Sequence, residues 1–164
     1  NAGDNCVRIL GGDYRFTHCT LANFYNWTVR KGTALRIANV QNGIAYPLSS
    51  AIFRNCLITG SGIDELNGEH SAEENNPFNY YFSYCLIHSV AEENDQRVNV
   101  LWSKEEHFLK LDIHSQLYDF RLDASSKAID IGKVADAQTY PLDRNGLSRL
   151  QDDAPDAGCY ERQP

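Results

Sequence analysis

The sequence has no methionine, no CxxC pair and no apolar run approaching the roughly 20 residues that a membrane helix needs. It also lacks an excess of positive charge, since 15 basic residues face 22 acidic ones and the net charge is −7. Nucleic acid and anionic membranes repel such a chain on average, so neither is an expected partner. The 5 prolines and 11 glycines are too few for a collagen-like or low-complexity chain. We therefore expect one folded domain with a hydrophobic core and no membrane span.

The chain begins NAGDNCVRIL, which is neither a signal peptide nor a helix start. Together with the missing methionine, this start indicates a processed secreted product or a fragment of a longer protein. A lipidated cysteine further upstream would make such a protein a membrane-anchored lipoprotein.

The odd number of cysteines excludes a fully paired disulfide framework. None of them forms the close pair that zinc sites need, so no metal site is expected among them. Because cysteine packs as a small hydrophobic residue, we expect buried free thiols. The five are Cys6, Cys19, Cys56, Cys85 and Cys159.

Three of the cysteines lie in similar segments, YRFTHCTLAN, AIFRNCLITG and YYFSYCLIHS. In each segment a phenylalanine comes three residues before the cysteine and an aliphatic residue two after it. Aromatic and β-branched residues dominate these segments, and Asn, Gly or Ser bound them, so each is predicted to be a strand. The two-residue period of a strand places the cysteine and the aliphatic residue on one face and the phenylalanine on the other.

A strand motif that recurs every few tens of residues is typical of a solenoid. Further short strands are expected at residues 24–27, 34–40 and 98–102, with no amphipathic helix between them. We therefore predict an all-β parallel β-helix over residues 1–120, with three of the cysteines stacked as an internal ladder. A β-sandwich is the alternative, but the Asn-Gly and Asp-Gly hairpins typical of that fold are scarce.

The segment 60–77 interrupts the repeat and opens an acidic region. No Lys or Arg occurs between Arg54 and Arg97, whereas eight acids do. Carboxylates are the ligands that calcium prefers, so a calcium site within residues 64–95 is one interpretation. A solvated acidic loop is the other, and the absence of D-x-D-x-D spacing favours it. The acids are Asp64, Glu65, Glu69, Glu73, Glu74, Glu92, Glu93 and Asp95.

Residues 121–164 are rich in turns and in short polar side chains, which satisfy backbone groups in tight turns. A solenoid needs a terminal segment that is polar outside and apolar inside, so this segment is predicted to be a C-terminal cap of the same domain.

Three stretches of this cap, SKAIDIG (126–132), DRNGLSR (143–149) and DAGCYE (156–161), resemble the tail of right-handed parallel β-helix surface proteins of the Bacteroidetes type. The preceding YDFRL (118–122) looks like the lead-in of that family. Lys127 and Cys159 depart from its pattern, which usually has proline and alanine there. The resemblance implies a right-handed β-helix on the outer-membrane surface of a Gram-negative bacterium or outside the cell, without cofactor. We expect a structural network that pins the tail to the final rung of the solenoid, formed by Asp130, Asp143, Arg149, Asp156 and Glu161.

The strand period also predicts an outward face that carries rings beside polar groups, an arrangement suited to sugars. We expect ligand-binding residues at Phe16, His18, Phe53, Asn55, Phe82 and Tyr84. No motif identifies catalytic residues, because G-x-S-x-G, H-E-x-x-H, P-loop and dinucleotide patterns are all absent. Acid/base candidates are limited to His18, His88, His107 and His114, with Arg15, Arg36, Arg54, Lys104 and Lys110.

Two functions remain open. The first is a non-catalytic extracellular protein that binds glycan or docks into a larger surface assembly. The second is the C-terminal portion of a polysaccharide lyase or glycoside hydrolase, enzymes that use acid/base groups or paired carboxylates on one long face. No such group recurs from repeat to repeat, which favours the first function.

Overall fold

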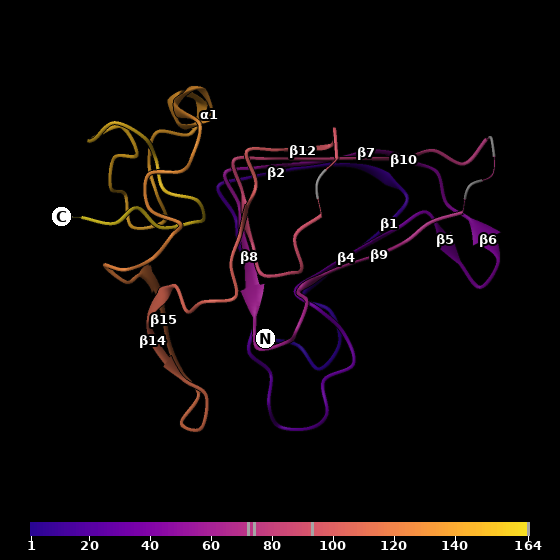
Figure 1. The fold of residues 1–164 in the computed structure, drawn as a ribbon, viewed down its shortest axis with the longest axis horizontal. Helices are drawn as coiled ribbons and strands as arrows, with labels where there is room; N and C mark the ends of the chain where they lie inside the picture. Colours follow the sequence, from indigo (N-terminus) through magenta and orange to yellow (C-terminus); the bar gives the residue numbers. More distant parts are fainter. Residues whose placement is uncertain (72, 74, 93, 164) are drawn as a thin grey trace.

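A computed structural model describes residues 1–71, 73, 75–92 and 94–163 (Figure 1). The regular structure is almost entirely β, with one short helix, α1 (Val134–Thr139), so the all-β prediction is confirmed. Within the described residues, no helix has both the length and the apolar character to cross a membrane.

Three of the sheets are parallel. Sheet I has the strand order β1-β4-β9, formed by Val7–Leu10, Leu35–Ala38 and Leu66–Glu69. Sheet II has the order β2-β7-β10-β12, formed by Gly12–Thr17, Leu48–Arg54, Phe78–Ser83 and Arg97–Val98. Sheet III has the order β3-β8-β11-β13, formed by Thr20–Asn23, Leu57–Gly60, Leu86–Ile87 and Leu101–Trp102. The in-register pairing of these strands aligns the three sequence motifs beside one another.

Each motif forms two strands joined by a corner, where a single strand was predicted. The residue before each cysteine has a left-handed backbone, with φ of 51° at His18, 50° at Asn55 and 52° at Tyr84. This residue turns the chain from sheet II into sheet III, so the two-residue alternation does not continue through it. As a result the phenylalanine and the cysteine of each motif face the same core. Its buried aromatic and thiol members include Phe53, Phe82, Cys56 and Cys85, and all five cysteines are free thiols.

Two further sheets are antiparallel. β14 (Phe108–Asp112) pairs with β15 (Leu117–Leu122), and β5 (Val40–Gln41) pairs with β6 (Ile44–Ala45). The β14–β15 hairpin contributes Phe108 and Leu122 to a second core with Leu57 and Leu86 of sheet III. Both faces of sheet III are therefore buried, one in each core.

The predicted right-handed parallel β-helix over residues 1–120 is wrong. The parallel strands form separate sheets of three or four strands that end at Trp102, and the chain then turns back into the antiparallel β14–β15 hairpin. Sheet I has no strand beside β9 on its far edge among the described residues. The repeated motif identifies a local unit of two strands joined by a corner. It does not specify a continuous β-helix over the whole of residues 1–120.

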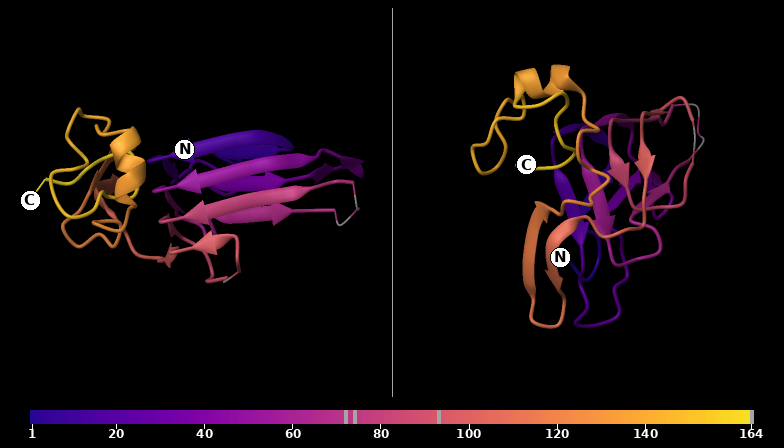
Figure 2. Two further views of the ribbon diagram at one scale, coloured as in Figure 1. Left: turned by 90° about the horizontal axis from the view of Figure 1, so that it is seen from above. Right: turned by 60° about the vertical axis from the view of Figure 1, so that its left-hand side comes forward.

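The turn-rich tail packs beside the corners between sheets II and III, where the strands of sheet II end (Figure 2). The backbone N–H of Lys133 donates to Asn55 Oδ1 at 2.8 Å, and the N–H of Gly158 donates to the Asn55 carbonyl at 2.8 Å. The N–H of Cys159 donates to Thr20 Oγ1 at 3.0 Å. The tail therefore closes the side of the sheets.

The five polar residues expected to pin the tail to a final rung bond instead to one another within the tail. Arg149 Nη1 lies 3.3 Å from Glu161 Oε2, and both side chains are buried. The N–H of Glu161 donates to Asp143 Oδ2 at 2.9 Å, and the N–H of Asp130 donates to Asp156 Oδ1 at 2.9 Å. These bonds hold the turns of the tail to one another.

Candidate functional site

The six residues predicted to bind ligand do not form an exposed face. Phe53 stacks between Phe16 and Phe82, with ring centroids 4.8 and 4.7 Å apart. His18 and Asn55 are buried beneath the tail, and Tyr84 is half-buried beside Lys133. The corners cause this outcome, because they turn the phenylalanines inward and present the corner residues to the tail.

The acid/base candidates are divided among several places. His18 lies under the tail, Arg36 pairs with Glu69, and Arg54 pairs with Asp136 at 3.3 Å. Exposed positions elsewhere are occupied by Arg15, Lys110 and His114.

The structure brings the remaining three candidates together. His88, His107 and Lys104 line one cavity of about 150 Å³ between sheet III and the β14–β15 hairpin. Burial lowers the pKa of both His88 and His107, so both imidazoles are neutral near pH 7. His107 Nδ1 lies 3.3 Å from Ser126 Oγ, whereas its buried Nε2 has no hydrogen-bond partner among the described residues.

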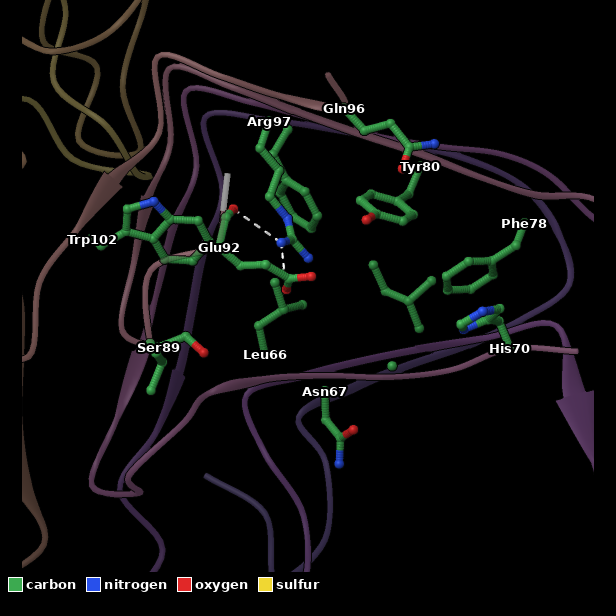
Figure 3. Close-up of a pocket in the computed structure, with 14 residues that line it drawn as sticks. Leu66, Asn67, His70, Phe78, Tyr80, Ser89, Glu92, Gln96, Arg97 and Trp102 are labelled. Carbon is green, nitrogen blue, oxygen red and sulfur yellow. Dashed lines mark hydrogen bonds and ion pairs between the residues drawn. The ribbon is translucent and has the colours of Figure 1, made fainter. Parts of the chain in front are cut away.

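A larger cavity, the aromatic pocket, lies where sheets I and II end at β9 and β12. Its volume is about 370 Å³. Figure 3 shows Phe78, Tyr80 and Trp102 around it, with Leu66 on the opposite side. Residues 89–92 and 94–96 lie outside strands, and no described strand pairs with β9 on the side of this pocket.

Arg97 is the central polar residue of the aromatic pocket. Its guanidinium lies 5.5 Å from the Tyr80 ring centroid and 5.7 Å from that of Trp102, within the range of cation–π attraction. Nη1 lies 2.5 Å from Glu92 Oε2 and donates to the Glu92 carbonyl at 3.1 Å. The side chain is 8% exposed, and Nε is buried with no hydrogen-bond partner among the described residues. Arg97 is therefore held in place by two rings and by Glu92.

Further polar side chains surround this centre. Asn67, His70, Ser89 and Gln96 line the pocket, and the His70 ring stacks on Phe78 with centroids 5.4 Å apart. Sequence reasoning missed every one of these residues. The available signal was Arg97 itself, the first cation after a long acidic stretch, followed closely by a tryptophan.

Several of the acids expected as calcium ligands bond to other residues. Glu65 is buried and pairs with Arg30 at 2.7 Å, and Asp64 accepts from the N–H of Val90 at 2.9 Å. Glu74 and Glu93 lie outside the described residues. In the part of the chain that is described, no group of three or more His, Cys, Asp or Glu residues is placed to hold a metal ion. Calcium binding in residues 64–95 stays an untested prediction.

Comparisons with protein-family models, with curated proteins and with solved structures gave no match for this chain. Its function therefore has to be inferred from the geometry of its own cavities.

Proposed function

We propose that the protein binds glycan chains through the aromatic pocket and does not cleave them. The observation that carries this proposal is the cavity lined by Phe78, Tyr80 and Trp102, in which the Arg97–Glu92 pair is held against two of the rings. Sugar rings have apolar C–H faces and hydroxyl edges, so an aromatic wall beside fixed polar groups suits them.

The charges in the pocket favour binding over hydrolysis. Glycoside hydrolysis generally needs two carboxyl groups that flank the scissile bond. Glu92 is the one carboxylate among the described residues that line the pocket, and it is paired with Arg97. Among the described residues, a further carboxylate, that of Asp64, lines the adjoining cavity and there accepts from the N–H of Val90.

Cleavage of a polysaccharide is the second candidate function, supported by the cavity of His88, His107 and Lys104. A neutral imidazole can accept a proton, as a lyase mechanism requires. That cavity has about 150 Å³, against about 370 Å³ in the aromatic pocket, and is small for a glycan chain. We therefore rank it second.

The location of the protein belongs to the same proposal. Free polysaccharide is met outside the cell or on its surface, so we propose an extracellular or cell-surface site of action. The resemblance of the three tail stretches to bacterial surface proteins supports this location. Docking into a larger surface protein assembly is the outcome to pursue if no glycan binds.

A binding and cleavage assay with plant, host and bacterial polysaccharides tests the proposal. We expect retention of at least one glycan without new chain ends. Tyr80→Leu, which keeps the apolar volume, should weaken retention by about tenfold through loss of a ring contact. Trp27→Ala removes an exposed tryptophan outside the pocket and should leave retention unchanged.

Two outcomes would contradict the proposal. Release of shortened products would favour polysaccharide cleavage. Loss of that release in His107→Gln would then show that the smaller cavity is where cleavage takes place. Equal losses of glycan retention in Tyr80→Leu and Trp27→Ala would show that the glycan binds outside the aromatic pocket.

A further inference from the structure

The formal charges of the aromatic pocket cancel. Arg97 and Glu92 are the cation and the anion among its described lining residues, apart from the histidine at its edge, and they are 2.5 Å apart. An acidic sugar would have to compete with Glu92 for the guanidinium, at the cost of leaving that carboxylate unpaired.

The surroundings of the pocket are acidic. Arg97 follows a stretch from residue 55 to 96 that contains no Lys or Arg, and the whole chain has a net charge of −7. The potential at the pocket mouth therefore opposes the approach of an anionic glycan.

The Glu92 carboxylate is the accessible member of the pair. The Arg97 side chain is 8% exposed, whereas that of Glu92 is 68% exposed, so a ligand meets the carboxylate first. A sugar hydroxyl can donate a hydrogen bond to this carboxylate. An ionised carboxylate or a sulfate has no hydrogen to donate and would be repelled.

From these observations we infer that the aromatic pocket selects an uncharged sugar unit, with a hydroxyl that donates to the Glu92 carboxylate. This inference rests on the proposed glycan binding and specifies its ligand. Specificity comes from Glu92, which blocks acidic units, while the aromatic residues contribute most of the contact area.

Matched pairs of glycans that differ only at the carboxyl group, which is reduced to an uncharged alcohol in one member, test the inference. The probes are polygalacturonate, alginate and hyaluronan, each beside its carboxyl-reduced form, at 50 and 500 mM NaCl. We expect a reduced form to bind at least tenfold more tightly than its acidic parent at low salt, with an affinity that changes little with salt. Tighter binding of an acidic form, weakened by salt, would overturn the inference and leave glycan binding intact. If neither form of any pair binds, both the inference and the proposed function fail.

Glu92→Gln tests the residue responsible. Its side chain is largely exposed, so the variant should fold, and it leaves Arg97 without a charged partner. We expect the preference for neutral over acidic glycans to fall by about three- to tenfold. Glu73→Gln is the matched control, since it removes an exposed acid from the same region outside the pocket. An unchanged preference in Glu92→Gln, or an equal change in Glu73→Gln, would show that the ion pair does not select the sugar.

Discussion

His18 is the residue whose charge matters most at the junction of sheets and tail. It occupies a left-handed corner and is buried under the tail, where its Nε2 lies 3.2 Å from Asn55 Nδ2. Asn55 Oδ1 accepts from the N–H of Lys133, so its amide nitrogen is the group that faces the histidine. That nitrogen donates, and His18 Nε2 must therefore be unprotonated. Burial, with a smaller contribution from Arg149, lowers the pKa of His18 to about 4.

This depressed pKa makes stability depend on pH. The unfolded chain binds a proton near pH 6.5 and the folded chain near pH 4, so stability falls as pH decreases between these values. The loss attributable to His18 is at most about 3 kcal/mol. His18→Asn keeps a residue that tolerates the left-handed backbone and removes the titration.

Urea unfolding of the wild-type protein and of His18→Asn at pH 7, 6, 5 and 4.5 measures the difference in their unfolding free energies. His88 and His107 titrate in both proteins, so the difference between them isolates His18. A parallel decline in the two proteins would show that His18 is not the responsible group.

At the scale of elements, the sheets depend on a column of stacked phenylalanines. Phe53 is fully buried between Phe16 and Phe82, at the centre of sheet II. Phe53→Ala removes a ring from both contacts and should cost about 3–5 kcal/mol of unfolding free energy. Phe16→Ala, at the half-buried edge of the column, should cost clearly less. Chemical denaturation measures both losses of unfolding free energy. Equal losses for Phe53→Ala and Phe16→Ala would mean that the strands of sheet II do not pair in this register.

Sequence patterns identified the strands but not their faces. The three motifs do contain strands, and their cysteines do line a core, because local composition is sufficient to specify both. The faces were wrong because one left-handed residue, such as Asn55, breaks the two-residue alternation, and asparagine, histidine and tyrosine at that position carry no common signal. The aromatic pocket could not be predicted, since Phe78 and Tyr80 of β10 meet Trp102 of β13 only once sheets II and III have formed.

At the scale of the whole molecule, the tail depends on a buried charge cluster. Arg149 is the cation that faces Glu161, with Asp143 and Asp156 close by. Burial raises the pKa of Glu161 to about 8, and Arg149 opposes that rise. Arg149 therefore stabilises the folded state more when Glu161 is charged than when it is protonated.

Removal of the cation should loosen the tail in a pH-dependent way. Arg149→Met leaves the carboxylates without a cation and should cost about 3–5 kcal/mol of unfolding free energy above pH 8, where Glu161 is ionised in the wild-type protein. Without Arg149 the pKa of Glu161 rises further, so below pH 7 the carboxyl is protonated in both folded proteins and the deficit should be smaller and nearly constant, growing as pH rises through 8 to 9. Glu161→Gln in the same chain should restore part of the loss, because the amide can still accept from the N–H of Asp156.

Hydrogen exchange locates the effect within the molecule. Because the tail packs on the side of the sheets, Arg149→Met should increase exchange at residues 143–161 while the amides of β7 and β8 stay protected. Arg144→Met is the matched control, since Arg144 is exposed and its guanidinium lies over the Tyr160 ring, while its backbone bond to Cys159 does not depend on the side chain. Faster exchange throughout sheets II and III would show instead that tail and sheets unfold as one unit. The tail would then be an integral part of the domain core, because its release would open the corners that Asn55 and His18 close.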